Sequence, residues 1–467
     1  MKGIRFISLI CCISAISACT AHRAPTTDVA SILEKMVTMD GKVVQPKIYG
    51  VHLLYPDTAP AAAPAPKGYT PCHLSHYGRH GARYIQYDTQ YFFVHDVLEK
   101  AFAADKLTKT GKQLRDEYRD FYNRIERHSG ELCPLGLVEH RQIAARMTSN
   151  YPELFKGNAR IEANSTNLER TMLSMWACLD ELHAINPELE IIPDGARVEM
   201  EALNPHCPEN TWGTSFDQMW KGTKAVWRQD FLTHSEQWID WKTFGDRIFT
   251  DLDWAQSICK VVNFEKDVYL IAADVPCMGL EGVNLFKYFT EDELLPLAKC
   301  GDNYLSYMEK SHSPQCPGRD WALCHTLLEN FIARADQDLK DGLGVRLRFG
   351  HDGCMMGMFV MMDLPGWNAP ASNPDEMWEV WDCSRIPMAS NLQMVLYRGR
   401  NAEDPILMTW RLNEEPMALP LEEVAPGFYR WEDFKAEYLP KIEQCKELLR
   451  QTAGLTPENF KYVPIKK

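Results

Sequence analysis

The chain has 467 residues, of which 45% are hydrophobic and 24% charged, and its formal net charge is −14. This length suggests two or three domains, and the composition is ordinary for a globular protein with a large core. The acidic balance argues against nucleic acid or an anionic membrane as a general partner, because both would repel it.

The N-terminus has the pattern of an export signal. Lys2 and Arg5 precede an apolar stretch over residues 6–16 that is too short to span a membrane, and Ile16-Ser17-Ala18-Cys19 follows. The pattern resembles a bacterial lipoprotein signal, which implies cleavage before Cys19 and lipid attachment to that residue. An ordinary secretory signal is the alternative.

The lipoprotein reading divides the N-terminal region into two parts. Residues 1–18 are the signal peptide, and residues 19–38 form a polar tether. The protein is then expected in the bacterial cell envelope, anchored to the outer membrane on its periplasmic or surface side. No other stretch is apolar enough to cross a bilayer, so membrane contact would be through the lipid alone.

A basic motif follows the first predicted strand. Residues 70–77 have the composition of a strand that ends near Gly78, and Arg79-His80-Gly81-Ala82-Arg83 comes next. The motif would lie at the carboxyl end of the strand, where open α/β sheets bind ligands. A neutral ring nitrogen is a nucleophile, and two guanidinium groups suit the oxygens of a phosphate. Gly81 is expected to let the backbone turn sharply and approach the anion closely. The alternative is a surface turn with solvated charges.

Residues 90–155 carry helical periodicity, and another basic position follows them. Thr166 and Glu169 have the spacing of a capping box, which predicts the start of a helix. Arg170 would then lie in the first helical turn, where its charge and the unpaired backbone N–H groups both favour an anion. An ordinary surface arginine is the alternative.

Residues 204–313 differ from the segments on either side. They show helical patterns without strand alternation, and they contain a crowd of large aromatic side chains: Trp212, Phe216, Trp220, Trp227, Phe231, Trp238 and Trp241. We predict a helical cap inserted into an α/β domain, whose two parts are residues 39–203 and 314–467. The aromatic side chains are expected to form core, while other cap residues line one wall of the cleft.

A second polar motif follows a second strand. Residues 345–349 alternate apolar side chains with two arginines, the pattern of a half-buried strand, and His351 and Asp352 come directly after Gly350. From this loop His351 would donate to the same phosphate, and Asp352 would protonate the departing oxygen. A solvated turn or a helix cap is the alternative.

The remaining elements complete the fold. The periodicity predicts a helix over 323–339, a buried helix over 355–364, a hairpin-like pair over 392–396 and 406–412, and a final helix over 431–449. Twelve cysteines remain when Cys11, Cys12 and Cys19 are set aside, and we expect at least one disulfide in an oxidising compartment. Others, such as Cys178 and Cys445, are expected as buried thiols.

Four further side chains lie near the motifs in the sequence. His73 and His76 are expected as satisfied sheet histidines, with one of them facing the cleft as the alternative, and Tyr84 and Arg348 as side chains that contact the site residues and not the substrate.

The motifs together resemble the histidine acid phosphatase family, in the branch that contains phytases and multiple inositol polyphosphate phosphatases. The matching segments are residues 79–84, residues 165–171 and Phe349-Gly350-His351-Asp352, in the order of the family. The resemblance implies an α/β fold like that of phosphoglycerate mutase, an α/β/α sandwich with an inserted helical cap. Many inositol polyphosphate phosphatases have His-Ala-Glu where this chain has His351-Asp352, which leaves the leaving group and the order of phosphate removal open.

The resemblance also implies a role for each matching residue. His80 is the nucleophile that forms a phosphohistidine, with its other ring N–H held by a backbone carbonyl. Asp352 is the proton donor, and the phosphate is bound by Arg79, Arg83, Arg170 and His351. No metal or other cofactor is required, because cationic side chains replace the magnesium of many phosphoryl-transfer sites.

The sequence thus predicts an exported, metal-independent phosphomonoester hydrolase that acts on inositol polyphosphates such as phytate. The expected partner is a small-molecule phosphate ester, with no nucleic acid. A broad acid phosphatase acting on sugar phosphates or nucleotides is the first alternative. A non-catalytic phosphoinositol-binding lipoprotein is the alternative from another class.

Overall fold

The computed structural model describes residues 39–42, 44–195, 197–205, 207, 226–313, 319–368 and 374–453. The predicted signal peptide, Cys19 and the tether lie outside these residues, as do Trp212, Phe216, Trp220 and Cys316. No helix within the described ranges has the length and apolar content needed to cross a bilayer.

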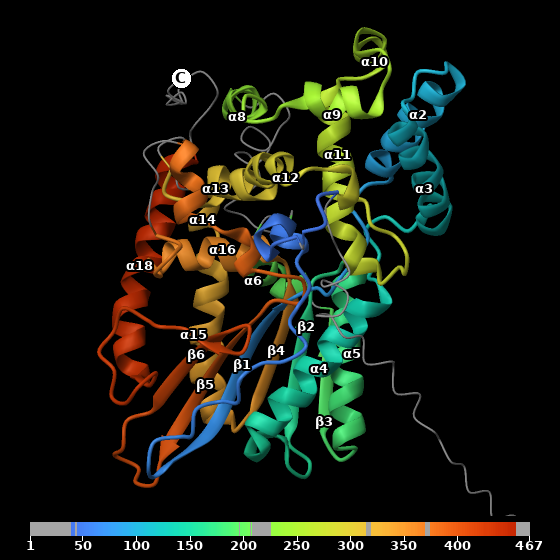
Figure 1. Ribbon diagram of the computed structural model, residues 1–467. Helices are drawn as coiled ribbons and strands as arrows, with labels where there is room; N and C mark the ends of the chain where they lie inside the picture. The colour runs from blue at the N-terminus through green and yellow to red at the C-terminus, as the bar shows by residue number, and fades with distance from the viewer. Residues whose placement is uncertain are drawn as a thin grey trace, which may run out of the picture.

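A central sheet of eight strands organises the described chain (Figure 1). Its order is β3-β2-β4-β1-β5-β6-β7, and β8 pairs with β6. The strands are β1 (Tyr69–Arg79), β2 (Arg160–Ser165), β3 (Glu190–Asp194), β4 (Val345–Gly350), β5 (Asn391–Gly399), β6 (Leu407–Leu412), β7 (Glu415–Pro416) and β8 (Tyr429–Arg430). The first four are parallel, while β5 and β6 run antiparallel and form the predicted hairpin-like pair.

The strand order brings the three sequence motifs together. Strand β4 lies between β1 and β2, with Arg79 opposite Gly350 and Ser165 opposite Phe349. All three strands are parallel, so their carboxyl ends meet at the same edge of the sheet. The segments that follow them therefore leave the sheet side by side.

Helices cover both faces of the sheet (Figure 1). On one face, α4 (Pro134–Asn150) and α5 (Glu169–Ile185) pack on Leu74, Val345, Leu347 and Phe349. On the other, α15 (His325–Asp341), α16 (Asp352–Met361) and α18 (Trp431–Thr452) pack on Tyr77, Leu392, Met394 and Trp410. The α/β/α arrangement and the predicted C-terminal elements are confirmed.

The prediction of a half-buried strand over residues 345–349 is wrong, because every residue of β4 is buried. Its two arginines face α15, where Asp338 and Asn330 accept hydrogen bonds from them, and Nη2 of Arg348 has no hydrogen-bond partner among the described residues. Arg346 forms two hydrogen bonds of 2.7 Å with Asp338, and Arg348 donates to Asn330 and Ser75 at 2.8 Å each. Alternation in this strand thus separates two buried faces, one apolar and one with an ion-paired arginine and a hydrogen-bonded one.

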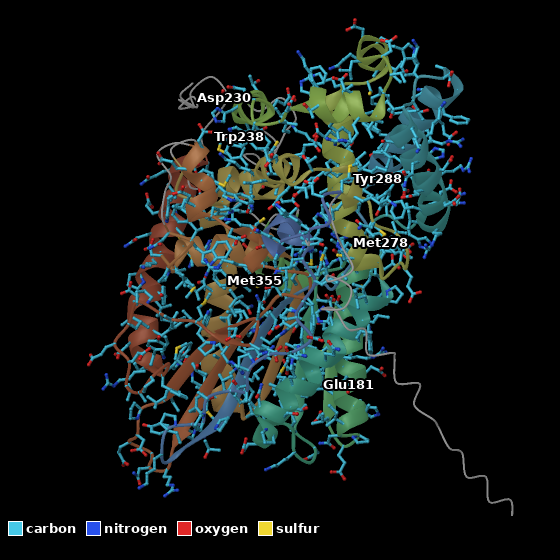
Figure 2. All side chains as sticks on the ribbon, in the orientation of Figure 1. Glu181, Asp230, Trp238, Met278, Tyr288 and Met355 are labelled. Carbon is cyan, nitrogen blue, oxygen red and sulfur yellow. The ribbon has the colours of Figure 1, made fainter. Side chains whose placement is uncertain are left out.

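A second group of helices lies above the carboxyl end of the sheet. Its apolar core joins α2 (Asp88–Ala103), α3 (Lys109–Ile125), α9 (Trp241–Ile248), α11 (Val261–Asp274) and α12 (Glu291–Ala298). The other described helices are α6 (Met200–Leu203), α8 (Val226–Glu236), α10 (Leu252–Ile258), α13 (Tyr304–Lys310), α14 (Arg319–Ala322) and α17 (Met377–Val380). Figure 2 shows Tyr288 in this upper group and Met355 of α16 below it.

The helices α2 and α3 share a core with α9 and α11. The predicted helical cap over residues 204–313 does not contain α2 or α3. Its boundaries stay a prediction.

The predicted capping box at the start of α5 does not form. The helix α5 begins at Glu169 with Leu168 as its N-cap, and no side chain caps it. Instead of capping, the Thr166 hydroxyl lies 2.6 Å from that of Thr171 and 3.3 Å from Nε2 of His351. Arg170 is nevertheless the second residue of the helix, as the position in the first turn requires.

The expected disulfide does not occur among the eleven cysteines that the structure describes, all of which are free. Ten of them are buried. Cys178 of α5 and Cys445 of α18 lie in the apolar cores on opposite faces of the sheet, so they are buried thiols as expected.

Candidate active site

The three motifs meet at a cavity of about 720 Å³ at the carboxyl end of the sheet. Five of the six residues predicted to act on the phosphate line it: His80, Arg83, Arg170, His351 and Asp352. We call Arg83, Arg170 and His351, which surround His80, the basic cage.

His80 lies directly after β1, with 3% of its surface exposed. Its Nδ1 is 2.9 Å from the carbonyl oxygen of Gly81. A carbonyl can only accept, so Nδ1 carries the proton and Nε2 keeps its lone pair. Burial and the nearby charge of Arg79 hold the pKa of His80 well below its usual value, and Arg83 and Arg170 act in the same direction. The ring is therefore neutral and nucleophilic.

The backbone after His80 is held by α4 and α5. The N–H of Gly81 donates to Oγ of Ser174 at 3.0 Å, and the N–H of Ala82 donates to the buried Glu139 at 2.7 Å. Gly81 does not have the positive φ that a sharp glycine turn would need. It is required for packing, because a Cβ there would lie 2.6 Å from Cα and the carbonyl oxygen of Gly136 in α4.

Arg83 and Arg170 supply closely spaced positive charge. Arg83 donates to the carbonyl of Tyr84 at 2.8 Å, and Nε of Arg170 is buried without a hydrogen-bond partner among the described residues. Burial and the charge of Arg83 lower the pKa of Arg170 to about 10. An anion in the cavity would relieve both effects, since it supplies the missing acceptor and offsets the repulsion.

His351 is the N-cap residue of α16 and completes the cage. Its ring centroid is 5.7 Å from that of His80, and its backbone N–H donates to the hydroxyl of Tyr77 at 2.9 Å. Burial and the charge of Arg170 lower its pKa to about 4. The N-terminus of α16 adds its own preference for an anion at this point.

Asp352 is the first residue of α16, and 28% of its side chain is exposed. One carboxylate oxygen is 3.0 Å from Nη2 of Arg79, and the other accepts from the N–H of Gly353 at 2.7 Å. Burial alone would raise its pKa, but the charges of Arg79 and His351 outweigh burial and lower the pKa to about 2. Without a bound anion the group is a carboxylate.

Arg79 does not line the cavity. It is fully buried, and its Nη1 donates to the carbonyls of Val51 at 2.7 Å and Ile386 at 2.9 Å. Its Nη2 forms the ion pair with Asp352, and its Nε has no hydrogen-bond partner among the described residues. Arg79 thus contacts Asp352 without lining the cavity, and its charge acts on both Asp352 and His80.

The four side chains that neighbour the motifs in the sequence lie at different places in the structure. His73 and His76 are buried in β1, but they are not fully satisfied, because Nε2 of His73 and Nδ1 of His76 have no hydrogen-bond partner among the described residues. Arg348 of β4 is buried against α15. Tyr84 stacks on His128 with ring centroids 5.2 Å apart.

Sequence reasoning missed two groups at this site. Glu139 accepts from the N–H groups of Ala82 and Tyr55, and so fixes the turn that carries His80. His52 lines the cavity at the end of η1 (Pro46–His52), where its Nδ1 is 2.6 Å from Asp274. No motif surrounds either residue, and the partners of His52 come from distant parts of the chain.

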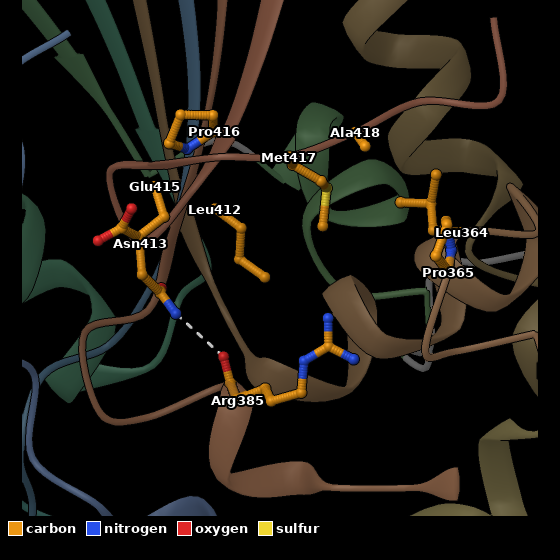
Figure 3. Close-up of a pocket in the computed structure, with 9 residues that line it drawn as sticks. All are labelled: Leu364, Pro365, Arg385, Leu412, Asn413, Glu415, Pro416, Met417 and Ala418. Carbon is orange, nitrogen blue, oxygen red and sulfur yellow. Dashed lines mark hydrogen bonds between the residues drawn. The ribbon is translucent and has the colours of Figure 1, made fainter. Parts of the chain in front are cut away.

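Another cavity, of about 440 Å³, lies at the turn after β6 (Figure 3). It is lined mainly by apolar and backbone groups, with Arg385 and Glu415 as its charged side chains. It contains no histidine or other nucleophile, so the cavity at the basic cage is the candidate active site. No group of three His, Cys, Asp or Glu side chains suited to a metal occurs in the described part of the chain.

Comparison with solved structures shows which fold this is. The multiple inositol polyphosphate phosphatase of Bifidobacterium longum, in complex with inositol hexasulfate, matches with a TM-score of 0.66 at 15% identity, over 83% of this chain and 97% of that chain. The phytase of D. castellii matches with a TM-score of 0.61 at 13% identity, over 92% of this chain and 95% of that chain. The chain has the fold of these phosphatases.

The phosphate complex of the Bifidobacterium longum enzyme gives a similar result, with a TM-score of 0.65 at 18% identity over the same shares of the two chains. No family model and no curated protein sequence matches this chain. The likeness at these identities is one of fold, and the fold class expected from the sequence is confirmed.

Proposed function

We propose that this protein hydrolyses phosphomonoesters through a phosphohistidine intermediate. The observation that carries the proposal is the neutral His80 ring, whose free Nε2 lies in a cavity surrounded by the basic cage. A lone pair, concentrated positive charge and a nearby carboxyl are the groups that phosphoryl transfer to and from histidine needs.

Inositol phosphates, including phytate, are the proposed substrate class. Two structures with this fold support it, one being a complex with inositol hexasulfate and the other a phytase. Sugar phosphates and nucleotides are the alternative.

Two displacements at phosphorus make up the proposed reaction. In the first, Nε2 of His80 forms a bond to phosphorus, the ester P–O bond breaks, and Asp352 gives a proton to the departing alkoxide. In the second, water attacks phosphorus, the P–N bond breaks, and Asp352 takes the proton of the water. Arg83, Arg170 and His351 hold the phosphate oxygens throughout, and Arg79 holds Asp352 in place.

The proton of Asp352 needs a source, because the group is ionised in the free protein. A phosphomonoester monoanion carries such a proton, since the second pKa of these esters is about 6. Its negative charge also offsets the guanidinium groups that keep Asp352 ionised. We therefore propose that the substrate enters as the monoanion and brings the proton with it.

The proposal includes independence of metal ions. Two guanidinium groups and two helix N-termini favour negative charge at the cage, the task that magnesium performs in many other phosphoryl-transfer sites. Phosphate release should therefore be the same with and without a chelator.

The test is phosphate release by the purified protein from inositol hexakisphosphate, glucose 6-phosphate and p-nitrophenyl phosphate at acidic pH with chelator present. Release that is lost in His80→Ala and kept in His183→Ala supports the proposal, because His183 is exposed at the far end of α5. Binding of the esters without any release would instead support the non-catalytic alternative.

We also propose that the protein is exported as a lipoprotein, on the basis of the segment that ends in Cys19. Labelled palmitate should enter the wild-type chain in a bacterial host and not the Cys19→Ser variant. Equal labelling of both, or of neither, would contradict lipidation at this residue.

A further inference from the structure

The cavity is larger than the basic cage and continues along a second wall. This outer wall is formed by His52, Asp302, Glu309 and Lys310. A substrate with its reacting phosphate in the cage would extend the rest of its alcohol into this cavity, whose charged lining among the described residues, apart from the cage, His80 and Asp352, is the outer wall.

Two carboxylates hold the only imidazole of the outer wall. Nδ1 of His52 is 2.6 Å from the buried Asp274, and its Nε2 is 3.3 Å from Asp302. Burial opposes protonation of His52, but hydrogen bonds to Asp274 and Asp302 outweigh it and raise its pKa. One imidazolium between two carboxylates leaves the group with a negative charge, and Asp302 is its exposed member, with 32% of its side chain accessible.

The lysine of the outer wall is matched by a carboxylate as well. Lys310 is buried and forms an ion pair with the buried Asp320. Glu309, the residue before it in α13, adds another carboxylate to the lining. The two cationic groups of the outer wall, His52 and Lys310, have three carboxylate partners between them among the described residues, so negative charge exceeds positive charge in this group even before Glu309 is counted, in contrast to the cage.

Resting on the function proposed above, we propose that Asp302 and Glu309 are specificity-determining residues. They select esters that carry hydroxyl groups beside the reacting phosphate over esters that carry further phosphates there. Carboxylate oxygens accept hydrogen bonds from hydroxyl groups and repel phosphates. The outer wall therefore both attracts hydroxyl-bearing esters and disfavours esters with additional phosphates. Within the inositol phosphates, the favoured substrates are then the lightly phosphorylated ones.

The experiment compares inositol hexakisphosphate with inositol monophosphate in the Asp302→Asn variant of the full chain. This change removes the charge of Asp302 and keeps the size of the side chain. The ratio of kcat/KM for the hexakisphosphate to kcat/KM for the monophosphate should rise roughly three- to tenfold, as expected for one like charge removed at a partly solvated site. A loss of folding alone would lower both values and leave the ratio as it was.

The matched control is Asp341→Asn, which removes the same charge at an exposed position before β4, at the other end of the sheet. It should leave the ratio at the wild-type value. If Asp302→Asn folds poorly, Glu309→Gln carries the same expectation.

An unchanged or lower ratio in both wall variants would overturn the specificity proposal alone, provided that the wild type hydrolyses the two esters. If the wild type releases phosphate from neither, the proposed function itself is wrong.

Discussion

The packing of Gly81 against Gly136 sets a sharp test of how His80 is positioned. A Cβ at position 81 would lie 2.6 Å from two backbone atoms of Gly136, about 0.8 Å inside ordinary van der Waals contact at 3.4 Å. Neither atom belongs to a flexible side chain, so α4 and the turn that contains His80 must move apart by a large part of this distance in Gly81→Ala. Because His80 precedes Gly81 and its Nδ1 is hydrogen-bonded to the Gly81 carbonyl, the imidazole moves with the turn.

The expected cost follows from the size of the shift. A displacement approaching 1 Å at reacting groups lowers turnover about 100-fold. Overpacking of this kind costs about 1–3 kcal/mol of stability, which lowers the melting temperature by several degrees. The measurements are kcat with p-nitrophenyl phosphate and a thermal melt.

Gly344→Ala is the control, because the nearest atom to its added Cβ is at 3.7 Å. A Gly81→Ala protein with wild-type kcat and melting temperature would refute the packing argument.

Three further predictions concern protons. Asp352→Asn should lower kcat for inositol or glucose phosphates about 100- to 10,000-fold and kcat for p-nitrophenyl phosphate much less, because only the poor leaving groups need a proton. An equal loss of kcat on both kinds of substrate would exclude Asp352 as the acid. In the wild type, kcat/KM should fall as the pH rises through about 6, where the ester loses the proton that Asp352 needs. His80 stays neutral down to more acidic pH, so it does not limit activity in this range. A value of kcat/KM that rises from pH 6 to pH 8 would contradict delivery of the proton by the substrate. Glu265 is buried with neither oxygen hydrogen-bonded among the described residues, and burial, with the charge of Glu293, raises its pKa to about 8. A carboxyl whose pKa is raised in the folded state stabilises the fold at pH values below its unfolded pKa and loses that contribution as the pH rises. The gain in melting temperature of Glu265→Gln over wild type should therefore be larger at pH 8 than at pH 5. An equal or smaller gain at pH 8 would contradict this prediction.

Local sequence patterns were enough to place most of the site. Each motif follows a strand whose composition or alternation is visible in the chain, and parallel strands deliver their carboxyl ends to one edge. The sequence could not give the strand order, yet any order that keeps β1, β2 and β4 adjacent brings His80, Arg170 and Asp352 to the same edge.

The failures share a physical cause, which is contact between residues far apart in the chain. The close approach of Gly136 leaves no room for a Cβ at position 81, and Thr166 contacts His351 where a cap was expected. Arg346 and Arg348 appear solvent-facing in the sequence but are buried against α15. The outer wall was invisible for the same reason, since His52 meets Asp274 and Asp302 only through the packing of η1 on the upper helices.

Covalent trapping shows whether phosphate passes through Nε2 of His80. The wild-type protein would be mixed with p-nitrophenyl phosphate, quenched in alkali within the first turnover and analysed by peptide mass spectrometry, because phosphohistidine survives alkali. We expect one phosphate on the peptide that contains His80, and none in His80→Ala. A phosphate trapped on another residue, or hydrolysis at full rate by the His80→Ala protein, would contradict it.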